Sequence, residues 1–107
     1  MEVFEQNGHK FINSDVFLGL ELVPNNSIDL IFLDPPYNIG KNFKTTKDKW
    51  NTDEDYLNWA YKWIDICIKK LKNNGSIYIM TSTQFMPYFD IYIRQNLTIL
   101  SRIGVCA

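Results

Sequence analysis

The sequence has few of the residues that build metal centres and disulfide frameworks. It holds two cysteines and one histidine, and neither Cys67 nor Cys106 belongs to a CxxC pair. This excludes a zinc site and a disulfide-stapled secreted scaffold, and it predicts free cytosolic thiols and no bound metal. No apolar run approaches the ~20 residues of a membrane span, and the N-terminus lacks the hydrophobic core of a signal peptide. We therefore expect a soluble, cytoplasmic protein that does not contact a membrane.

The sequence also lacks an excess of charge of either sign. Its 11 basic residues face 12 acidic ones. A histone-like binder would carry a basic excess, so any contact with nucleic acid must come from a local basic segment. With 46% hydrophobic residues, the 107-residue chain can bury a core, and disorder of the whole chain is excluded. The length fits one small domain or a part of one.

Apolar periodicity predicts alternating strands and helices in the first half of the chain. A short strand is expected at residues 10–13. Ser14 or Asp15 can then cap a short helix that extends to Val23. Residues 28–33 are apolar on both alternating faces after the first pair, which predicts a strand that is covered on both sides in a parallel sheet.

The second half of the chain begins with strong helix signals. Thr52 with Asp55 resembles a capping box, and apolar residues recur every three or four positions up to Leu71. Gly75 is the expected C-cap of this helix.

Two strands and one helix are expected after this long helix. The predicted elements are a buried strand at 76–80, a helix at 83–96 and a third core strand at 97–103. Strands that alternate with helices of this length predict an α/β fold with a doubly wound parallel sheet and right-handed connections.

The segment before the long helix is basic. Its lysines, opposed by Asp48 alone, are Lys41, Lys44, Lys47 and Lys49. These side chains can contact DNA phosphates, and each contact would add salt-dependent affinity. For each of them a solvated loop is an equally good alternative.

A four-residue segment, Asp34-Pro35-Pro36-Tyr37, directly follows the strand at 28–33. Two successive prolines cannot continue a ladder, so the segment must be a loop at the carboxyl end of that strand. Ligands of open α/β sheets bind at this edge, which makes the segment a candidate site. A plain turn, with Tyr37 packed beneath it, is the alternative, since a four-residue match also arises by chance. The buried strand before the segment and the basic loop after it favour a site.

Around these residues the sequence resembles the amino-methylating DNA methyltransferases that use S-adenosylmethionine. The resemblance covers almost all of the chain up to Ile103. It is carried by residues 27–40, by Asn13-Ser14-Asp15, by Tyr56 with Trp59 and Trp63, and by residues 71–79. The arrangement is similar to the beta-type order, in which the catalytic half precedes the glycine motif of the cofactor site. It implies an incomplete Rossmann-like α/β sheet that holds the catalytic half only.

The resemblance implies that Asp34, Pro35, Pro36 and Tyr37 are catalytic. An exocyclic amine is a poor nucleophile, because its lone pair is delocalised into the ring. The Asp34 carboxylate and the Pro35 carbonyl can accept its N–H bonds and localise that pair. Tyr37 would stack on the flipped base, returning about 1 to 3 kcal/mol. Asp15 and Asp34 would contact the cofactor, although Asp15 also makes sense as a plain N-cap.

The leading aspartate bears on the target base. In the family, aspartate before Pro-Pro-Tyr is more typical of adenine enzymes, and serine of N4-cytosine enzymes. Asp34 therefore implies methylation of adenine N6 in double-stranded DNA, in a restriction-modification system whose cognate restriction endonuclease is a candidate partner. N4-cytosine methylation and a non-catalytic remnant stay as alternatives.

The sequence contains no GxG loop of the kind that brings the backbone to the methionine end of this cofactor. The family places that loop after a target-recognition region, and we expect both to be absent. The chain is therefore interpreted as an inactive N-terminal fragment of a longer enzyme, whose reading frame was lost near Gly104.

Other methyltransferase classes fit less well. Cytosine-C5 enzymes attack through a cysteine that follows proline, whereas Cys67 follows Ile66 and Cys106 follows Val105. Methylases of ribosomal RNA guanine or protein glutamine usually carry their glycine loop before a similar tetrapeptide. Only a short stretch precedes the tetrapeptide here, which favours DNA as the substrate.

Overall fold

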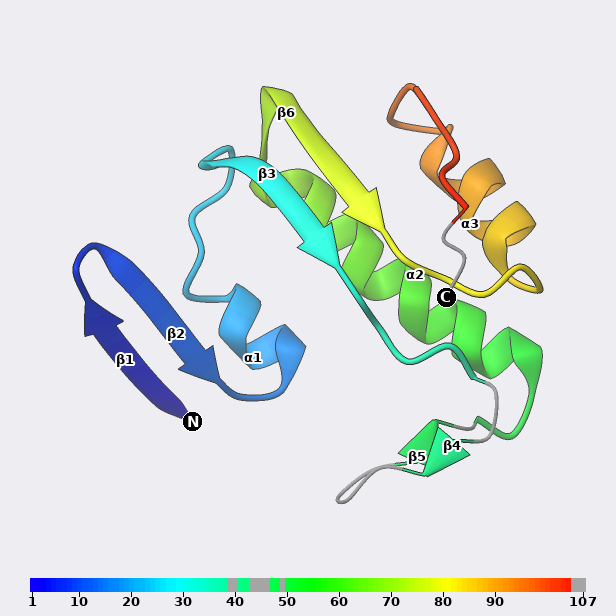
Figure 1. The fold of residues 1–107 in the computed structure, drawn as a ribbon, viewed down its shortest axis with the longest axis horizontal. Coiled ribbons are helices and arrows are strands. Elements are labelled where there is room, and N and C mark those ends of the chain that lie inside the picture. The colour runs from blue at the N-terminus through cyan, green and yellow to red at the C-terminus, as the bar shows by residue number, and fades with distance from the viewer. Residues whose placement is uncertain (39–40, 43–46, 49, 105–107) are drawn as a thin grey trace.

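A computed structural model describes residues 1–38, 41–42, 47–48 and 50–104 of the chain. Its elements, shown in Figure 1, are β1 (Glu2–Gln6), β2 (His9–Asn13), α1 (Val16–Leu20), β3 (Ile28–Leu33), β4 (Lys41–Asn42), β5 (Lys47–Asp48), α2 (Asp53–Lys70), β6 (Leu71–Ile79) and α3 (Met86–Ile93). The chain is a mixed α/β structure with a short parallel sheet. No helix of this described part is long and apolar enough to span a membrane.

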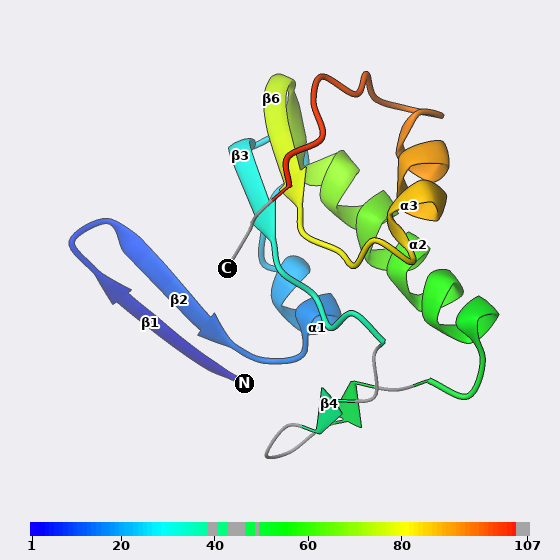
Figure 2. The same ribbon diagram turned by 45° about the vertical axis from the view of Figure 1, so that its right-hand side comes forward.

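The parallel pair β3–β6 organises the structure. Leu30 pairs with Ser76 and Leu33 with Ile79 in one register, and the Met80 amide donates to the Leu33 carbonyl at 2.9 Å. Helix α2 connects the two strands, and α2 and α3 lie on the same side of the sheet (Figure 2). The strand predicted at 28–33 and its parallel pairing are thus confirmed.

The opposite face of this sheet is uncovered in the described structure. The side chains of Leu30 and Phe32 are 59% and 64% exposed, and the Phe32 ring stacks on the exposed Tyr78 ring with centroids 6.5 Å apart. The expectation that residues 28–33 are covered on both sides is therefore wrong. Apolar alternation predicts which residues favour burial, but a second layer must be present to bury them.

The predicted third strand at 97–103 is also wrong, because these residues form no strand. Leu100 is 89% exposed and Ile103 is 72% exposed. A strand needs a neighbour to satisfy its ladder hydrogen bonds, and this segment pairs with neither strand of the sheet. β-propensity without a pairing partner therefore did not produce a strand.

Helix α2 begins as the sequence predicts. Thr52 Oγ1 accepts a hydrogen bond from the Asp55 amide at 3.0 Å, and three acidic residues occupy the first turn, where the positive end of the helix dipole favours them. The helix ends earlier than expected, since Leu71 already has an extended backbone and pairs with Ile28.

Gly75 is not the C-cap of α2, and that prediction is wrong. It lies within β6, where the register is irregular between Leu71 and Ser76. A Cβ atom at Gly75 would stand 2.6 Å from Leu71 Cδ1 and 3.1 Å from the Asp29 carbonyl oxygen. The glycine therefore leaves room for the Leu71 side chain of β6 and for the Asp29 carbonyl of the neighbouring strand β3, and it does not end a helix.

Strand β2, predicted at residues 10–13, pairs with β1 in an antiparallel hairpin that projects away from the sheet (Figure 1 and Figure 2). Strand β1 was not predicted. Asn7 and Gly8 join the strands with φ values of 53° and 79°, the left-handed conformations that a tight hairpin turn requires. The Asn-Gly pair was thus a usable signal. Helices α1 and α3 are shorter than the predicted 16–23 and 83–96.

The core is aromatic and lies between α2 and α3. We call Tyr56, Trp63, Phe85 and Phe89 the aromatic core; all four are at most 3% exposed. Burial of each such side chain contributes about 1.5 to 3 kcal/mol. The half-buried Trp50 and Trp59 pack against it.

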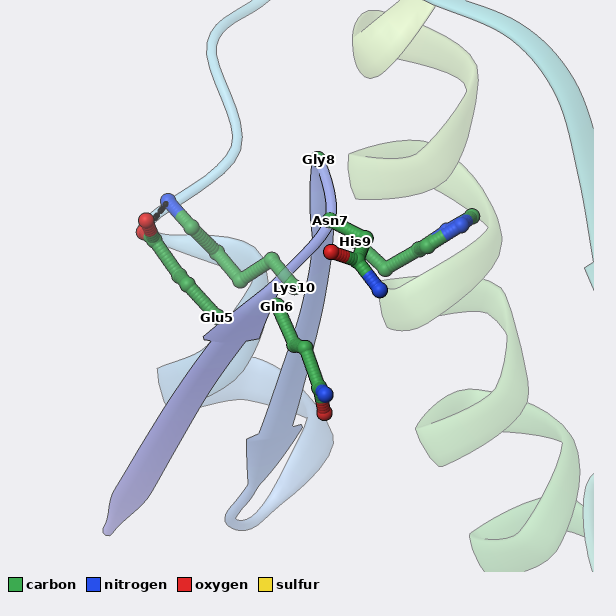
Figure 3. A pocket seen from close by; sticks show the side chains of 6 residues that line it. All are labelled: Glu5, Gln6, Asn7, Gly8, His9 and Lys10. Atoms are coloured by element: carbon green, nitrogen blue, oxygen red, sulfur yellow. Dashed lines mark ion pairs between the residues drawn. The ribbon is translucent and has the colours of Figure 1, made fainter.

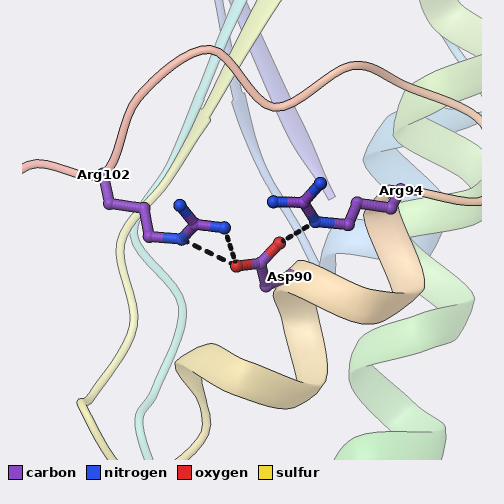
Figure 4. Close-up of polar contacts among 3 residues, drawn as sticks. All are labelled: Asp90, Arg94 and Arg102. Carbon is purple, nitrogen blue, oxygen red and sulfur yellow. Dashed lines mark hydrogen bonds and ion pairs between the residues drawn. The ribbon is translucent and has the colours of Figure 1, made fainter.

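The segment after α3 is held to that helix by Asp90 (Figure 4). Arg94 Nε and Arg102 Nε each donate to the Asp90 carboxylate at 2.7 Å. Both hydrogen bonds lower the pKa of Asp90 from its ordinary value of 3.8, and the bond from Arg94 has the larger effect. The carboxylate therefore prefers the ionised form in the folded chain.

This pKa shift predicts a pH-dependent contribution to stability. Because the pKa is lower in the folded than in the unfolded chain, the stabilisation is present above about pH 4 and is lost as the pH falls through the folded pKa. Urea unfolding should show Asp90→Asn less stable than the parent at pH 7, with the difference shrinking below pH 4. Asp29→Asn, which breaks the exposed Asp29–Lys72 pair, is the control and should change little at either pH. A difference for Asp90→Asn that is constant from pH 7 to pH 3 would contradict the prediction.

Candidate active site at the end of β3

The Asp34–Tyr37 tetrapeptide leaves the carboxyl end of β3, as predicted. The bond from the Met80 amide to the Leu33 carbonyl ends the sheet directly before Asp34, so the end of β6 lies beside the tetrapeptide. Asp34 is exposed, and the three residues after it are half-buried. A carboxylate thus faces solvent at the edge where ligands of parallel sheets bind.

Tyr37 contacts Asp34 within this loop. The Tyr37 hydroxyl donates a hydrogen bond to Asp34 Oδ1 at 2.6 Å. This is a charge-assisted bond, and its length fits the short range of such bonds. The tetrapeptide therefore holds its carboxylate and its aromatic ring together.

Helix α2 contacts the same loop through Tyr56. The Tyr56 hydroxyl donates to the Pro36 carbonyl oxygen at 2.6 Å, and the residue is 0% exposed. Its ring lies 4.8 Å from both the Phe85 and Trp50 rings. Sequence reasoning noted Tyr56 as part of the resemblance and gave it no place in the site. No local signal pairs it with a residue 20 positions earlier.

Asn38 supplies a second contact, between the loop and Trp50, which lies just before α2. It adopts the left-handed conformation, with φ of 59°, and its Oδ1 accepts the Trp50 amide at 2.9 Å. Asparagine tolerates this conformation better than most residues. The bond brings the two ends of the segment 38–50 together beside the aromatic core.

The basic segment is only partly described. Lys41 and Lys47 lie in the small hairpin β4–β5, where Lys41 pairs with Asp48 and Asn42 with Lys47. Lys44 and Lys49 lie outside the described residues. Contact of these four lysines with DNA stays a prediction.

Asp15 caps α1, since its Oδ2 accepts the Phe17 amide at 2.9 Å. The N-cap role is confirmed, while a contact with the cofactor stays a prediction. The four described glycines are Gly8 in the β1–β2 turn, Gly19 in α1, Gly75 in β6, and Gly104. None of these four lies in a glycine loop directly after a strand, where a backbone could approach the cofactor. The described structure shows two carboxylates among the residues expected to hold S-adenosylmethionine, those of Asp15 and Asp34, and contact of either with the cofactor stays a prediction.

The described chain offers neither a thiolate nucleophile nor a cluster of metal ligands. Cys67 is buried in α2, and burial raises the pKa of its thiol, which disfavours the thiolate that a C5-type nucleophile needs. No group of three or more His, Cys, Asp or Glu side chains that could hold a metal ion occurs among the described residues.

A hollow of about 420 Å³ lies at the turn of the β1–β2 hairpin (Figure 3). It is lined by six consecutive residues, 5–10, including the exposed Glu5–Lys10 ion pair at 3.2 Å. None of the candidate site residues lines it. It is the space between side chains of an exposed hairpin, and we assign it no function.

Comparison with known proteins identifies relatives over most of the chain. The DNA methylase family model (N6_N4_Mtase) matches residues 28–104. DNA adenine methyltransferase YhdJ of Escherichia coli is 43% identical over 94% of this chain. Type II methyltransferases M.BamHI of Bacillus amyloliquefaciens and M.HpaI of Haemophilus parainfluenzae are 35% and 38% identical over 90% and 82% of it.

The chain spans 34%, 23% and 28% of the lengths of these three relatives. The family match includes β3, the tetrapeptide, α2 and β6, which are the elements that form the candidate site. Because that match extends over more than half of the sequence, the chain belongs to the N6/N4 DNA methylase family.

Proposed function

We propose that residues 1–107 form the catalytic part of a Rossmann-like DNA methyltransferase that methylates adenine N6 in double-stranded DNA. The observation that carries the proposal is the exposed Asp34 carboxylate, at the carboxyl edge of the β3–β6 sheet, in a loop anchored on α2. The name of the E. coli relative supports adenine as the target. Because the chain spans about a third of that relative, the activity is proposed for the whole protein that contains it.

The chemistry requires two acceptors for the N–H bonds of the adenine amine. Asp34 supplies the first, and the Pro35 carbonyl the second, since the Pro36 carbonyl already accepts from Tyr56. Holding both N–H bonds localises the lone pair on N6, so that it can form the new N–C bond. When bound, S-adenosylmethionine would supply the methyl group from its sulfonium, with the S–CH3 bond breaking and its electron pair staying on sulfur in the departing neutral thioether. The amine proton then leaves towards the Asp34 carboxylate and solvent. Such preorganised acceptors stabilise the developing charge without reorganisation.

Tyr37 has two roles in this proposal. In the described structure its hydroxyl satisfies Asp34, and with DNA bound its ring stacks on the flipped adenine while the amine replaces the hydroxyl. A hydrogen bond to a charged group is worth about 1.5 to 3 kcal/mol. Base stacking returns about 1 to 3 kcal/mol. The free energy lost with the Tyr37–Asp34 hydrogen bond is comparable to that gained by stacking on the base, so the move of Tyr37 from one contact to the other costs little.

Membership of the family also suggests which residues contact the DNA backbone and the cofactor, and which protein acts with the enzyme. Lys41, Lys44, Lys47 and Lys49 would contact phosphates beside the target base. Asp15 would contact the cofactor from the start of α1. Two of the relatives described above are named type II methyltransferases, which supports a cytoplasmic restriction-modification role with a cognate endonuclease as partner.

The assignment of Asp34 predicts a loss of catalysis without a loss of DNA binding. Loss of one preorganised polar partner costs about 2.7 to 4 kcal/mol in the transition state. In a full-length protein that contains residues 1–107, Asp34→Ala should therefore lower the single-turnover methylation rate a hundredfold or more, while fluorescence anisotropy shows unchanged DNA affinity. Asp29→Ala removes a carboxylate from β3, the strand before the tetrapeptide, and should keep the parent's rate. A rate for Asp34→Ala within about tenfold of the parent would sink the assignment.

The choice of adenine predicts the product. DNA methylated by the full-length protein, digested to nucleosides and separated by chromatography with mass detection, should contain N6-methyladenosine in its deoxy form. N4-methyldeoxycytidine as sole product would overturn the target and keep the mechanism, because both amines are ring-conjugated. DNA that gains neither nucleoside would contradict the proposed function.

A further inference from the structure

A hydrogen bond from the buried Tyr56 links the tetrapeptide to α2. Tyr56 donates its hydroxyl proton to the Pro36 carbonyl at 2.6 Å from a fully buried position on α2. Its ring is fixed by Phe85 and Trp50, each at 4.8 Å, and by Phe89 at 6.3 Å. The hydroxyl therefore cannot follow a moving carbonyl without disturbing the aromatic core.

The backbone of the tetrapeptide has little other freedom. The rings of Pro35 and Pro36 fix both φ angles near −65°. A residue before proline is restricted in ψ, which limits Asp34 and Pro35. The ψ angle of Pro36 is the main torsion left, and it sets both the direction of the Pro36 carbonyl and the path of the chain into Tyr37.

We propose that Tyr56 is a positioning residue, which fixes the Pro36 ψ angle and thereby places Tyr37 and the Asp34 and Pro35 acceptors for the target base. The inference rests on the proposed function and adds to it a residue that does not touch the substrate. Tyr56 would act through its hydrogen bond to the Pro36 carbonyl. Its loss should leave each catalytic group present and free to adopt unproductive positions.

The chain offers a matched control in Tyr92. Its hydroxyl donates to both carboxylate oxygens of Asp65 at 2.8 and 2.9 Å, and its ring stacks on Tyr61 at 4.0 Å. Like the bond of Tyr56, this hydrogen bond involves α2. It links α2 to α3, however, and does not involve the tetrapeptide. Tyr56→Phe and Tyr92→Phe each remove one oxygen atom and keep the stacked ring.

The first measurement uses the 107-residue chain and needs no activity. In ¹H–¹⁵N spectra, Tyr56→Phe should shift the backbone amides of Tyr37 and Asn38, and Tyr92→Phe should leave them in place. Unchanged amides of Tyr37 and Asn38 in Tyr56→Phe would overturn the proposal. Loss of the dispersed spectrum as a whole would make Tyr56 a structural residue and would also overturn it.

The second measurement uses the full-length protein, below the unfolding temperature of the weakest variant. Tyr56→Phe should lower kcat about tenfold to a hundredfold, the cost of misplaced reacting groups, with unchanged DNA affinity. The base-flipping signal of 2-aminopurine at the target should also fall. Tyr92→Phe should keep the parent's kcat and flipping signal. Equal effects of the two variants on kcat would overturn the positioning role.

The two failures are distinguishable. A parent protein that methylates no DNA contradicts the proposed function, whatever the variants do. In that case the amide shifts of the 107-residue chain still decide whether Tyr56 positions the loop.

Discussion

The packing of α2 against α3 through the aromatic core, against which Leu33 of β3 and Ile79 of β6 also pack, is the constraint on which the candidate site depends. Parallel strands need a crossover, and α2 provides it while burying Tyr56 and Trp63 against α3. The same packing brings the start of α2 to the carboxyl edge of the sheet, where the tetrapeptide leaves β3. Fold stability and site geometry therefore share one set of contacts.

Local signals were sufficient for the parts of the structure that local interactions determine. The strand at 28–33, the Thr52 cap and the position of the tetrapeptide could all be predicted, since each depends on residues close in sequence. Even β1 had a local signal in Asn7-Gly8, which was overlooked. The edge at which Asp34 lies is predictable because the strand, the proline pair and the crossover helix follow one another along the chain.

The remaining features depend on contacts between distant residues. Gly75 has the sequence context of a helix end, but it lies within β6, close to the Leu71 side chain and to the Asp29 carbonyl of the neighbouring strand. Residues 97–103 have the composition of a strand and no strand beside them to pair with. The bond from Tyr56 to Pro36 joins a helix to a loop 20 residues earlier, so only the tertiary structure reveals it.

The uncovered face of the sheet has a consequence for the behaviour of the 107-residue chain in solution. Leu30, Phe32 and Tyr78 form an apolar surface next to strand edges that have free ladder positions among the described residues. Such a surface lowers its free energy by contact with any other apolar surface, including that of a second chain. The colloidal stability of the isolated chain should therefore depend steeply on concentration, and mild detergent or low protein concentration would favour the monomer.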